Sequence, residues 1–523
     1  MASGKVKSAQ AQKAKINLIK AIVIVVLVLC VGGFFVYISG ILPRLLTGVK
    51  IVENAADGTQ TTIENVSVQE LNYHFYEVYS MYSMYGMVSK DTLDDPTDPD
   101  TEGSQTYREF MYQTAADEVM NSALVRRSSE QYNYESHSGA ARYALLQLEG
   151  MKSTAQSYGY NSFNQYLQIM YGTGFNASDY RKFSEREAFT QEFENYMKQF
   201  ILIPSDEEIQ AAYDNDPKAY QRADLNYYLF SAEMDADGNY TNLPATVTQA
   251  NAVMTKVNGG MSFKDAVKAV LEQDAEANAD KLASFEDDSV DPTFVSGYSQ
   301  ATAEYQFKEE VANVLFGDDA EPGKAKVVET ESGTYVVCLV ELSVDETPTV
   351  TYRTLTIAND AKNDAEATEA QIADGLAQAR AQADSIVATR MDPLGFADAV
   401  KQNSTNANEI LSGGYVSGDT AASYVGGTSD DDSETVDEAQ AAINAQLGSW
   451  LFDEARAQGD TLIINSADSS SVTIYYFDNI KPAWMVTARD KITTALVNGW
   501  SQDLKANNPS YIINYSLSQF LQY

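Results

Sequence analysis

The longest apolar segment of the chain lies near its N-terminus. Residues 21–42 contain no charged side chain, and five lysines but no acidic residue precede them. A helix of that length can cross the hydrocarbon core of a bilayer, which is about 30 Å thick. We therefore predict a transmembrane helix over residues 21–42, in contact with the lipid bilayer. The positive-inside rule then places residues 1–20 in the cytoplasm and residues 43–523 outside it.

Two other interpretations of this segment are weaker. A cleaved signal peptide would have a shorter polar lead, a shorter apolar core and a small-residue cleavage site after it. A lipoprotein signal would need a small residue before Cys30, where the sequence has Leu29. The pattern favours an uncleaved, single-pass anchor.

The next part of the chain changes from polar to helical. Residues 43–66 are polar without a strong period, which predicts a tether. From residue 67 apolar side chains recur at steps of three and four, and Ser67 is a suitable helix cap. Helices are expected near residues 105–132, 139–157, 161–171 and 177–200. We predict one helical domain over residues 67–220.

Beyond residue 220 the sequence repeats itself. Residues 263–268 read FKDAVK and residues 396–401 read FADAVK, an offset of 133. A second marker, LF then six residues then Gly, ends at Gly323 and recurs ending at Gly459, an offset of 136. Each unit opens and closes with a strand-like run. The spacing predicts two tandem α+β domains, over residues 221–345 and 346–483.

The C-terminal segment, residues 484–523, is predicted to be helical again. Ile492, Leu496, Trp500 and Leu504 lie four residues apart and form one apolar stripe. A single amphipathic helix has to bury such a stripe against another element. We expect it to pack on the helical domain of residues 67–220. The predicted fold class is therefore α+β, with an anchor, a helical domain completed by the C-terminal helix, and two inserted α+β units.

Charge and composition exclude several functions. The chain has a net charge of −38, and residues 51–523 carry 29 basic against 74 acidic side chains. Such a surface repels phosphate backbones, so nucleic acid is excluded as a partner. The chain has only two histidines, which argues against a zinc site built from histidines and against a Ser-His catalytic triad. No nucleotide-binding glycine motif is present, and no cofactor is expected. The two cysteines favour a bacterial envelope protein over a disulfide-rich animal ectodomain.

The order of these parts resembles the SurA/PrsA/PpiD class of extracytoplasmic foldases, whose parvulin-type domains are peptidyl-prolyl isomerases. Residues 206–213 read DEEIQAAY after the helical domain, and residues 413–418 read GGYVSG, similar to the parvulin G-G-x-L-G element. The resemblance extends over nearly everything from residue 67 onward. It implies unfolded or partly folded secreted proteins as partners, with the secretion channel as a further candidate.

The positions that carry parvulin catalysis are substituted. The resemblance implies two histidines and a Cys or Asp around the proline bond. In the first unit the histidine positions align with Tyr227 and Tyr335, and the acid position with Gln273 or Asp274. In the second unit the corresponding positions, by our alignment, are Arg353, Val472 and Asn406.

These substitutions favour a chaperone without efficient isomerase activity, anchored in the cell membrane. Two alternatives stay open at this point. One is an active isomerase that uses substituted residues, so that the sequence leaves open whether the protein is an enzyme. The other is a structural envelope protein that uses the parvulin fold for interactions.

One predicted helix is unusually rich in Tyr and Met. Tyrosines recur every three residues, with methionines between them, and the candidate client-binding set is Tyr73, Tyr76, Tyr79, Met81, Tyr82, Met84 and Tyr85. A helix has 3.6 residues per turn, so side chains three residues apart shift gradually around its axis. The set therefore covers most of the helix circumference. The helix is either buried on several sides, or it presents an adaptable surface to unfolded chains.

An acidic loop has part of a calcium-binding pattern. Asp98, Asp100, Glu102 and Glu109 occupy positions 1, 3, 5 and 12 of an EF-hand loop, with Gly103 at position 6. Glu102 is not the usual residue at position 5, and Pro96 should end the entering helix early. A solvated acidic loop is the favoured interpretation, and calcium the weaker alternative.

Overall fold

The computed structural model describes residues 23–28, 31–32, 41–55, 57–101, 103–235, 238–287, 289–364, 366–424 and 438–520. The predicted cytoplasmic tail, residues 1–20, and most of the predicted membrane span lie outside these residues. Among the helices that are described, none is both long enough and apolar enough to cross a bilayer. This finding corrects the predicted fold class: the described residues form an α+β fold in which no helix can span a membrane.

The two ends of the described chain meet in one small sheet. β1 (Thr47–Asn54) pairs with β2 (Gln60–Ser67) on one side and with β13 (Pro509–Ile513) on the other, all antiparallel. A short helix, α2 (Ile41–Leu45), precedes β1 and α19 (Tyr515–Phe520) follows β13. The predicted tether over residues 43–66 is therefore wrong. Val49 and Ile51 are completely buried, because β1 is covered from both edges.

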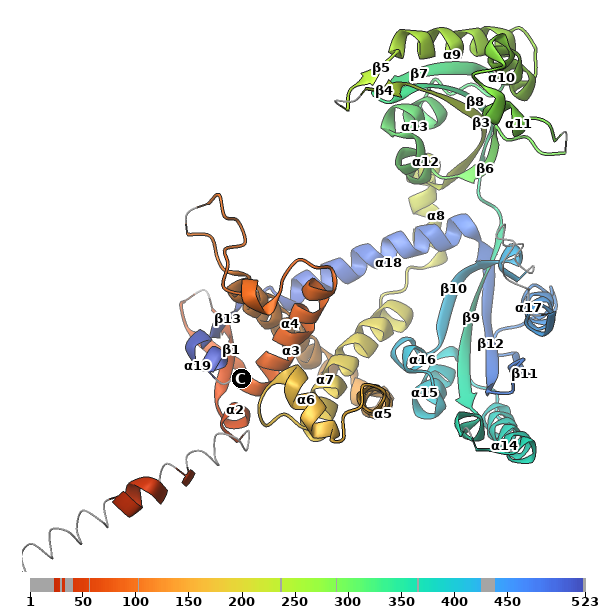
Figure 1. Ribbon diagram of the computed structural model, residues 1–523. Helices are drawn as coiled ribbons and strands as arrows, with labels where there is room; N and C mark the ends of the chain where they lie inside the picture. Colours follow the sequence, from red (N-terminus) through yellow and green to blue (C-terminus); the bar gives the residue numbers. More distant parts are fainter. Residues whose placement is uncertain are drawn as a thin grey trace, which may run out of the picture.

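The helical domain packs around this sheet (Figure 1). Its helices are α3 (Val68–Met84), α4 (Tyr107–Ser129), α5 (Ala140–Ser157), α6 (Phe163–Tyr171) and α7 (Ala177–Tyr196), close to the predicted ranges. Side chains cap their N-termini: Ser67 accepts from the Glu70 amide, and Thr106 and Asn176 form capping boxes. α7 ends in a π-helical turn, η4 (Met197–Ile201). Short 3-10 turns are η1 (Lys90–Thr92), η2 (Glu130–Tyr132) and η3 (Tyr134–His137).

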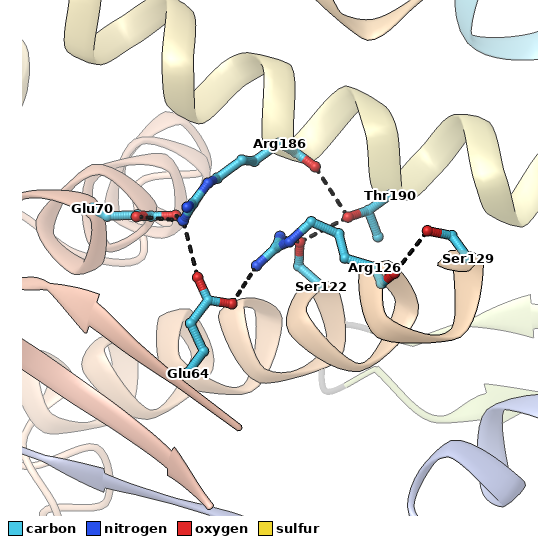
Figure 2. A network of polar contacts seen from close by, with 7 residues as sticks. All are labelled: Glu64, Glu70, Ser122, Arg126, Ser129, Arg186 and Thr190. Atoms are coloured by element: carbon cyan, nitrogen blue, oxygen red, sulfur yellow. Dashed lines mark hydrogen bonds and ion pairs between the residues drawn. The ribbon is translucent and has the colours of Figure 1, made fainter. Parts of the chain in front are cut away.

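Buried ion pairs tie the small sheet to these helices. Arg186 of α7 donates to both carboxylate oxygens of Glu70, at 2.7 and 2.9 Å, and to Glu64 of β2 at 3.1 Å (Figure 2). Glu64 also accepts from Arg126 of α4, at 2.7 Å. Glu70 is almost completely buried, so removing Arg186 would leave an unpaired charge in the interior. The network therefore specifies how β2, α3, α4 and α7 meet.

The first α+β unit, between the helical domain and residue 345, contains a four-stranded sheet of order β6-β3-β8-β7. Its elements are β3 (Gln221–Ser231), β4 (Glu233–Met234), β5 (Tyr240–Thr241), α9 (Leu243–Asn258), α10 (Phe263–Leu271), η6 (Glu272–Asp274), α11 (Ala279–Ala283), β6 (Phe294–Tyr298), α12 (Gln300–Phe307), α13 (Glu309–Phe316), β7 (Ala325–Thr330) and β8 (Gly333–Val344). One face of the sheet packs on α9 and α10, and the other on α12 and α13.

The second α+β unit has the same strand order, β10-β9-β12-β11. Its elements are β9 (Pro348–Ala358), η7 (Asp360–Asn363), α14 (Glu369–Val387), α15 (Pro393–Asn403), α16 (Ala407–Ser412), β10 (Tyr415–Thr420), η8 (Ala421–Tyr424), α17 (Glu438–Leu451), β11 (Thr461–Asn465) and β12 (Ser471–Pro482). α14 and α15 cover one face of the sheet, and α17 covers the other.

One long helix joins the three parts. α18 (Ala483–Leu504) runs from the last strand of the second unit back to the helical domain (Figure 1). At its start, Trp484 packs on Tyr213 of α8 (Asp206–Asn215) and on Tyr220 of η5 (Pro217–Tyr220). At its end, Trp500 packs edge-on against Phe193 of α7, with ring centroids 5.9 Å apart.

Replacing Trp500 by Ala should destabilise the helical domain, because Trp500 contacts α7 and donates a hydrogen bond to Ser128 of α4 at 3.4 Å. We expect a loss of about 2 kcal/mol, below the range for a fully buried aromatic since Trp500 is partly exposed. Denaturant unfolding measures the loss, and hydrogen exchange should show lower protection in α4 and α7. Leu496→Ala, one turn before Trp500 on α18 and 40% exposed, is the matched control; the predicted stripe is therefore only partly buried. Equal effects of the two variants would contradict the expected packing role.

Candidate functional site

The Tyr/Met helix divides into a buried half and an exposed end. Tyr73, Phe75, Tyr76 and Val78 of α3 lie in the core of the helical domain. Tyr73 stacks with Phe175 and donates a hydrogen bond to Glu187, and burial raises its pKa well above the ordinary tyrosine value. Tyr79 and Tyr82 are partly buried against the same core. These tyrosines are structural.

The end of α3 and the turn that follows it present the remaining candidates, Met81, Met84 and Tyr85, to solvent, together with the neighbouring Met87. Met81, Met84, Tyr85 and Met87 are exposed by 49, 75, 68 and 59%. Residues 81, 84 and 85 stand at i, i+3 and i+4, so they share one face of the helix. On the opposite side, Tyr82 packs edge-on against Phe110 of α4, with centroids 5.6 Å apart. We call Met81, Met84, Tyr85 and Met87 the methionine face.

In the first unit, the two substituted histidine positions lie on one side of the sheet with Phe307 between them. The ring centroid of Phe307 is 4.6 Å from that of Tyr227 and 6.0 Å from that of Tyr335. Phe307 comes from α12 and is only 1% exposed. Burial raises the pKa of Tyr335, so its phenol stays neutral at physiological pH. The aromatic ring of Phe307 therefore packs against both tyrosines.

Asp274 plays a local role. It is exposed at the end of η6, where its carboxylate accepts a hydrogen bond from the Ala277 amide at 3.3 Å. This is the role of a residue that ends a helical turn.

The strand registers of the two units correct our alignment of the second one. The Tyr227 amide donates to the carbonyl of Thr293, and the equivalent bond of the second sheet runs from Thr354 to Gly414. Tyr227 is paired with Val337, and Thr354 with Tyr475. Both sheets also have a bulge at the same place. In the first unit it lies in β8 between Leu339 and Glu341, and in the second it lies in β12 between Phe477 and Asn479.

By this register, the residue equivalent to Tyr227 is Thr354, and the one equivalent to Tyr335 is Thr473. Arg353 and Val472 each lie one position away, on the opposite face of the sheet. Val472 is completely buried there, in the core formed with α14 and α15. A shift of one residue reverses the face of every side chain in a strand, which is why the alignment by sequence failed here.

Arg353 is instead buried between the second unit and the helical domain. Its side chain is 2% exposed, with Nε 3.1 Å from Asp478 and Nη1 donating to Gln199 of η4 at 2.8 Å. The guanidinium also lies over the rings of Phe200 and Tyr415. Burial lowers the pKa of Arg353 from its ordinary value. Its contacts hold the two parts of the molecule together.

Asn406, the predicted acid position of the second unit, caps α16. Its side chain accepts from the amides of Asn408 and Glu409. The acidic residue near the sheet is Glu409, which sequence analysis missed. Glu409 accepts from the Thr356 hydroxyl and amide, at 2.7 Å each, and from Ser404 at 2.6 Å. All of its bonds are internal, as expected for a buried structural carboxylate.

Gly413 and Gly414, the element that resembles the parvulin glycine pair, are required by the backbone. Both have positive φ, +61° and +72°. A Cβ on Gly414 would lie 2.1 Å from the carbonyl oxygen of Thr354. Only glycine permits this close approach at the start of β10.

The acidic loop is stabilised by its own side chains. Asp98 accepts from the Thr101 hydroxyl at 2.6 Å and from the Asp100 amide at 3.0 Å. Glu109 belongs to the capping box of α4, where it accepts from the Thr106 amide. Glu102 lies outside the described residues. Within the described ranges, no group of three or more His, Cys, Asp or Glu side chains is placed to hold a metal ion.

A second polar interface joins the second unit to the helical domain, and the sequence did not indicate it. His137 and Asp398 are 2.8 Å apart, and Lys401 donates to the Tyr134 hydroxyl at 2.7 Å. Beside them Glu192, 1% exposed, accepts from Ser138 at 2.7 Å. With the contact between Arg353 and Gln199, the bonds of His137 and Tyr134 dock the second unit on η3 and η4.

No known protein family matches the chain, and no curated protein matches it closely enough to count as a relative. The functional assignment therefore depends on the geometry above.

Glu192 should make this interface sensitive to pH. Burial raises its pKa from 4.5 to about 7, while Lys401 and hydrogen bonds from Ser138 and Gly139 act in the opposite direction. A carboxyl with a raised folded pKa contributes stability that is complete below about pH 4.5 and is lost as the pH rises through about 7. As the pH rises over this range, the free energy of unfolding of the wild type should fall by at most about 3 kcal/mol relative to that of Glu192→Gln. This bound follows because a shift of one pKa unit is worth about 1.4 kcal/mol.

Urea unfolding of both proteins between pH 4.5 and 8 measures the difference. A difference that stays constant, or that rises with pH, would contradict the raised pKa of Glu192.

Proposed function

We propose that this protein is a chaperone that binds unfolded or partly folded polypeptides without isomerising them. The observation that carries the proposal is the methionine face at the end of α3. Its flexible, polarizable side chains are exposed on a helix whose other half is anchored in the core. Such a surface adapts to apolar segments of many sequences, because Met has several rotatable bonds and no preferred partner shape.

The arrangement of the two α+β units supports a noncatalytic role. Rotation about a prolyl bond has a barrier of about 18–20 kcal/mol, and an isomerase lowers it by stabilising the twisted bond. In the first unit the histidine positions are Tyr227 and Tyr335, and the ring of Phe307 packs against both. In the second unit the equivalent positions are Thr354 and Thr473, which supply hydroxyl groups but no imidazole.

The charge of the protein suits this role. A net charge of −38 keeps a complex with an apolar client in solution and repels nucleic acid and other acidic partners. The family resemblance and the low cysteine content place this activity outside the cytoplasm, with secreted proteins as clients. Both the location and the clients are part of the proposal.

Replacing Met81, Met84 and Tyr85 together by Ser should weaken chaperone activity and leave the fold intact. These side chains are exposed, so the free energy of unfolding should change by less than about 1 kcal/mol. Suppression of the aggregation of a chemically denatured client, measured by light scattering, should require several times more protein. Met234, Met261 and Tyr305 of the first unit are also exposed, and their triple replacement by Ser is the matched control.

Equal loss of activity in the two triple variants would contradict a specific role of the methionine face. Absence of aggregation suppression in the wild type would instead favour a structural role. A prolyl-peptide isomerisation assay on the same preparation tests the remaining alternative. Activity typical of a parvulin, abolished by Tyr227→Phe, would favour an enzyme with substituted residues.

A further inference from the structure

A pocket of about 270 Å³ lies where the second unit, the helical domain and α18 meet. Its walls come from η4 and the following segment (Gln199 to Ile209), from β9, β10 and β12, and from the first turns of α18. A cavity of this size accommodates a group of one amino-acid residue or a small organic molecule. It is separate from the methionine face, and the inference drawn from it goes beyond the proposed function.

The pocket contains an excess of positive charge. Arg353 pairs with Asp478, and Lys481 pairs with Asp206 at 3.3 Å. Arg489 of α18 is the remaining cation. It donates to the Tyr415 hydroxyl at 3.0 Å and lies 5.8 Å from the centroid of that ring. Within the described ranges, no carboxylate oxygen comes within 4.0 Å of its guanidinium nitrogens in an ion pair.

Tyr415 and Asp478 place the two arginines in the same small volume. The Arg353 guanidinium lies 5.3 Å from the centroid of the Tyr415 ring, which Arg489 also contacts. Asp478 is attracted to both arginines, and its charge offsets one of them. The three groups together carry one net positive charge. A ligand with one negative charge would neutralise it, whereas a doubly charged phosphate would leave a net negative charge beside Asp478.

The rest of the lining is mixed: Gln199, Thr351, Gln458 and Asn479 add uncharged polar groups, and the other residues are mainly apolar. Phe200, Ile203, Ile209, Met485 and Val486 face the same space. A pocket with apolar walls and a few convergent polar groups selects a ligand that has both kinds of surface. A guanidinium binds a carboxylate through two parallel hydrogen bonds, which makes it the preferred cation for this anion.

We propose that this pocket binds a carboxylate joined to a short apolar group, with Arg489 as its principal partner. The carboxylate comes either from the C-terminus of a peptide or from a free organic acid, since both present the same chemistry. The ligand would contact the second unit, the helical domain and α18 at once, and so stabilise their arrangement.

The test uses the full-length protein and four probes. They are 4-methylpentanoate, the peptide N-acetyl-Ala-Ala-Leu with a free carboxylate, its C-terminal amide, and inorganic phosphate. Isothermal titration calorimetry gives the affinities, and the fluorescence of Trp484, beside the pocket residue Met485, reports binding at this site. We expect the two carboxylates to bind and the amide to bind at least about tenfold more weakly, as for a lost charged hydrogen bond. Tighter binding of the peptide acid identifies a C-terminus as the source, and tighter binding of 4-methylpentanoate a free acid.

Arg489→Gln should weaken the carboxylates by a similar factor, and Arg380→Gln, on α14 outside the pocket, should leave their affinity unchanged. Circular dichroism checks that both variants fold. If Arg489→Gln is unfolded, Arg489→Lys replaces it, and it should also bind more weakly because an ammonium lacks the planar fork. Equal binding of acid and amide, stronger binding of phosphate, unchanged affinity in the Arg489 variant, or no binding of either carboxylate would overturn the proposal.

Discussion

The antiparallel pairing of β1 with β13 closes the helical domain, and the other parts of the molecule are arranged around it. The pairs run from Val49 with Ile513 to Glu53 with Pro509, so the domain is built from both ends of the described chain. Asn54 adds side-chain bonds to Asn508 and Ser510. Both α+β units are therefore insertions in one domain. Pairing strands so distant in sequence carries a large loop-closure cost, which packing of the sheet on α3 and α4 has to offset.

The two inserted units are attached by different kinds of contact. Three polar contacts cross the interface between the second unit and the helical domain. They join Arg353 to Gln199, Lys401 to Tyr134, and Asp398 to His137. Buried charges tolerate little displacement, because a separated ion would be left unpaired in a low-dielectric environment. Where the first unit begins, the contact is aromatic: Tyr220 packs on Trp484 at the start of α18. Aromatic packing is less directional, so the first unit can change its angle at a smaller cost.

Local patterns predicted much of this structure, and non-local pairing accounts for what they missed. The helices from α4 to α7 and the repeated unit follow from periodicity and capping, whereas the Gly413–Gly414 pair was noticed only through the family resemblance. β1 and β2 were missed because their burial depends on β13, more than 400 residues away in sequence. Arg353 was assigned to the wrong face because a strand register has to be known to one residue. The Glu192 and Glu409 carboxylates had no local signal, since only tertiary packing buries them.

The division of α3 explains how one helix can support both stability and binding. Its N-terminal half is held by the Glu70–Arg186 ion pair and by the aromatic core around Tyr73 and Phe75. The helix then extends beyond that core, and its last turn is fixed on one side only, by Tyr82 against Phe110. Substitutions in the last turn can therefore alter the exposed surface without disturbing the core. For the binding of unfolded chains that we propose, the rigid backbone beneath the methionine face needs little reorganisation, while its flexible side chains adapt at some cost in rotamer entropy.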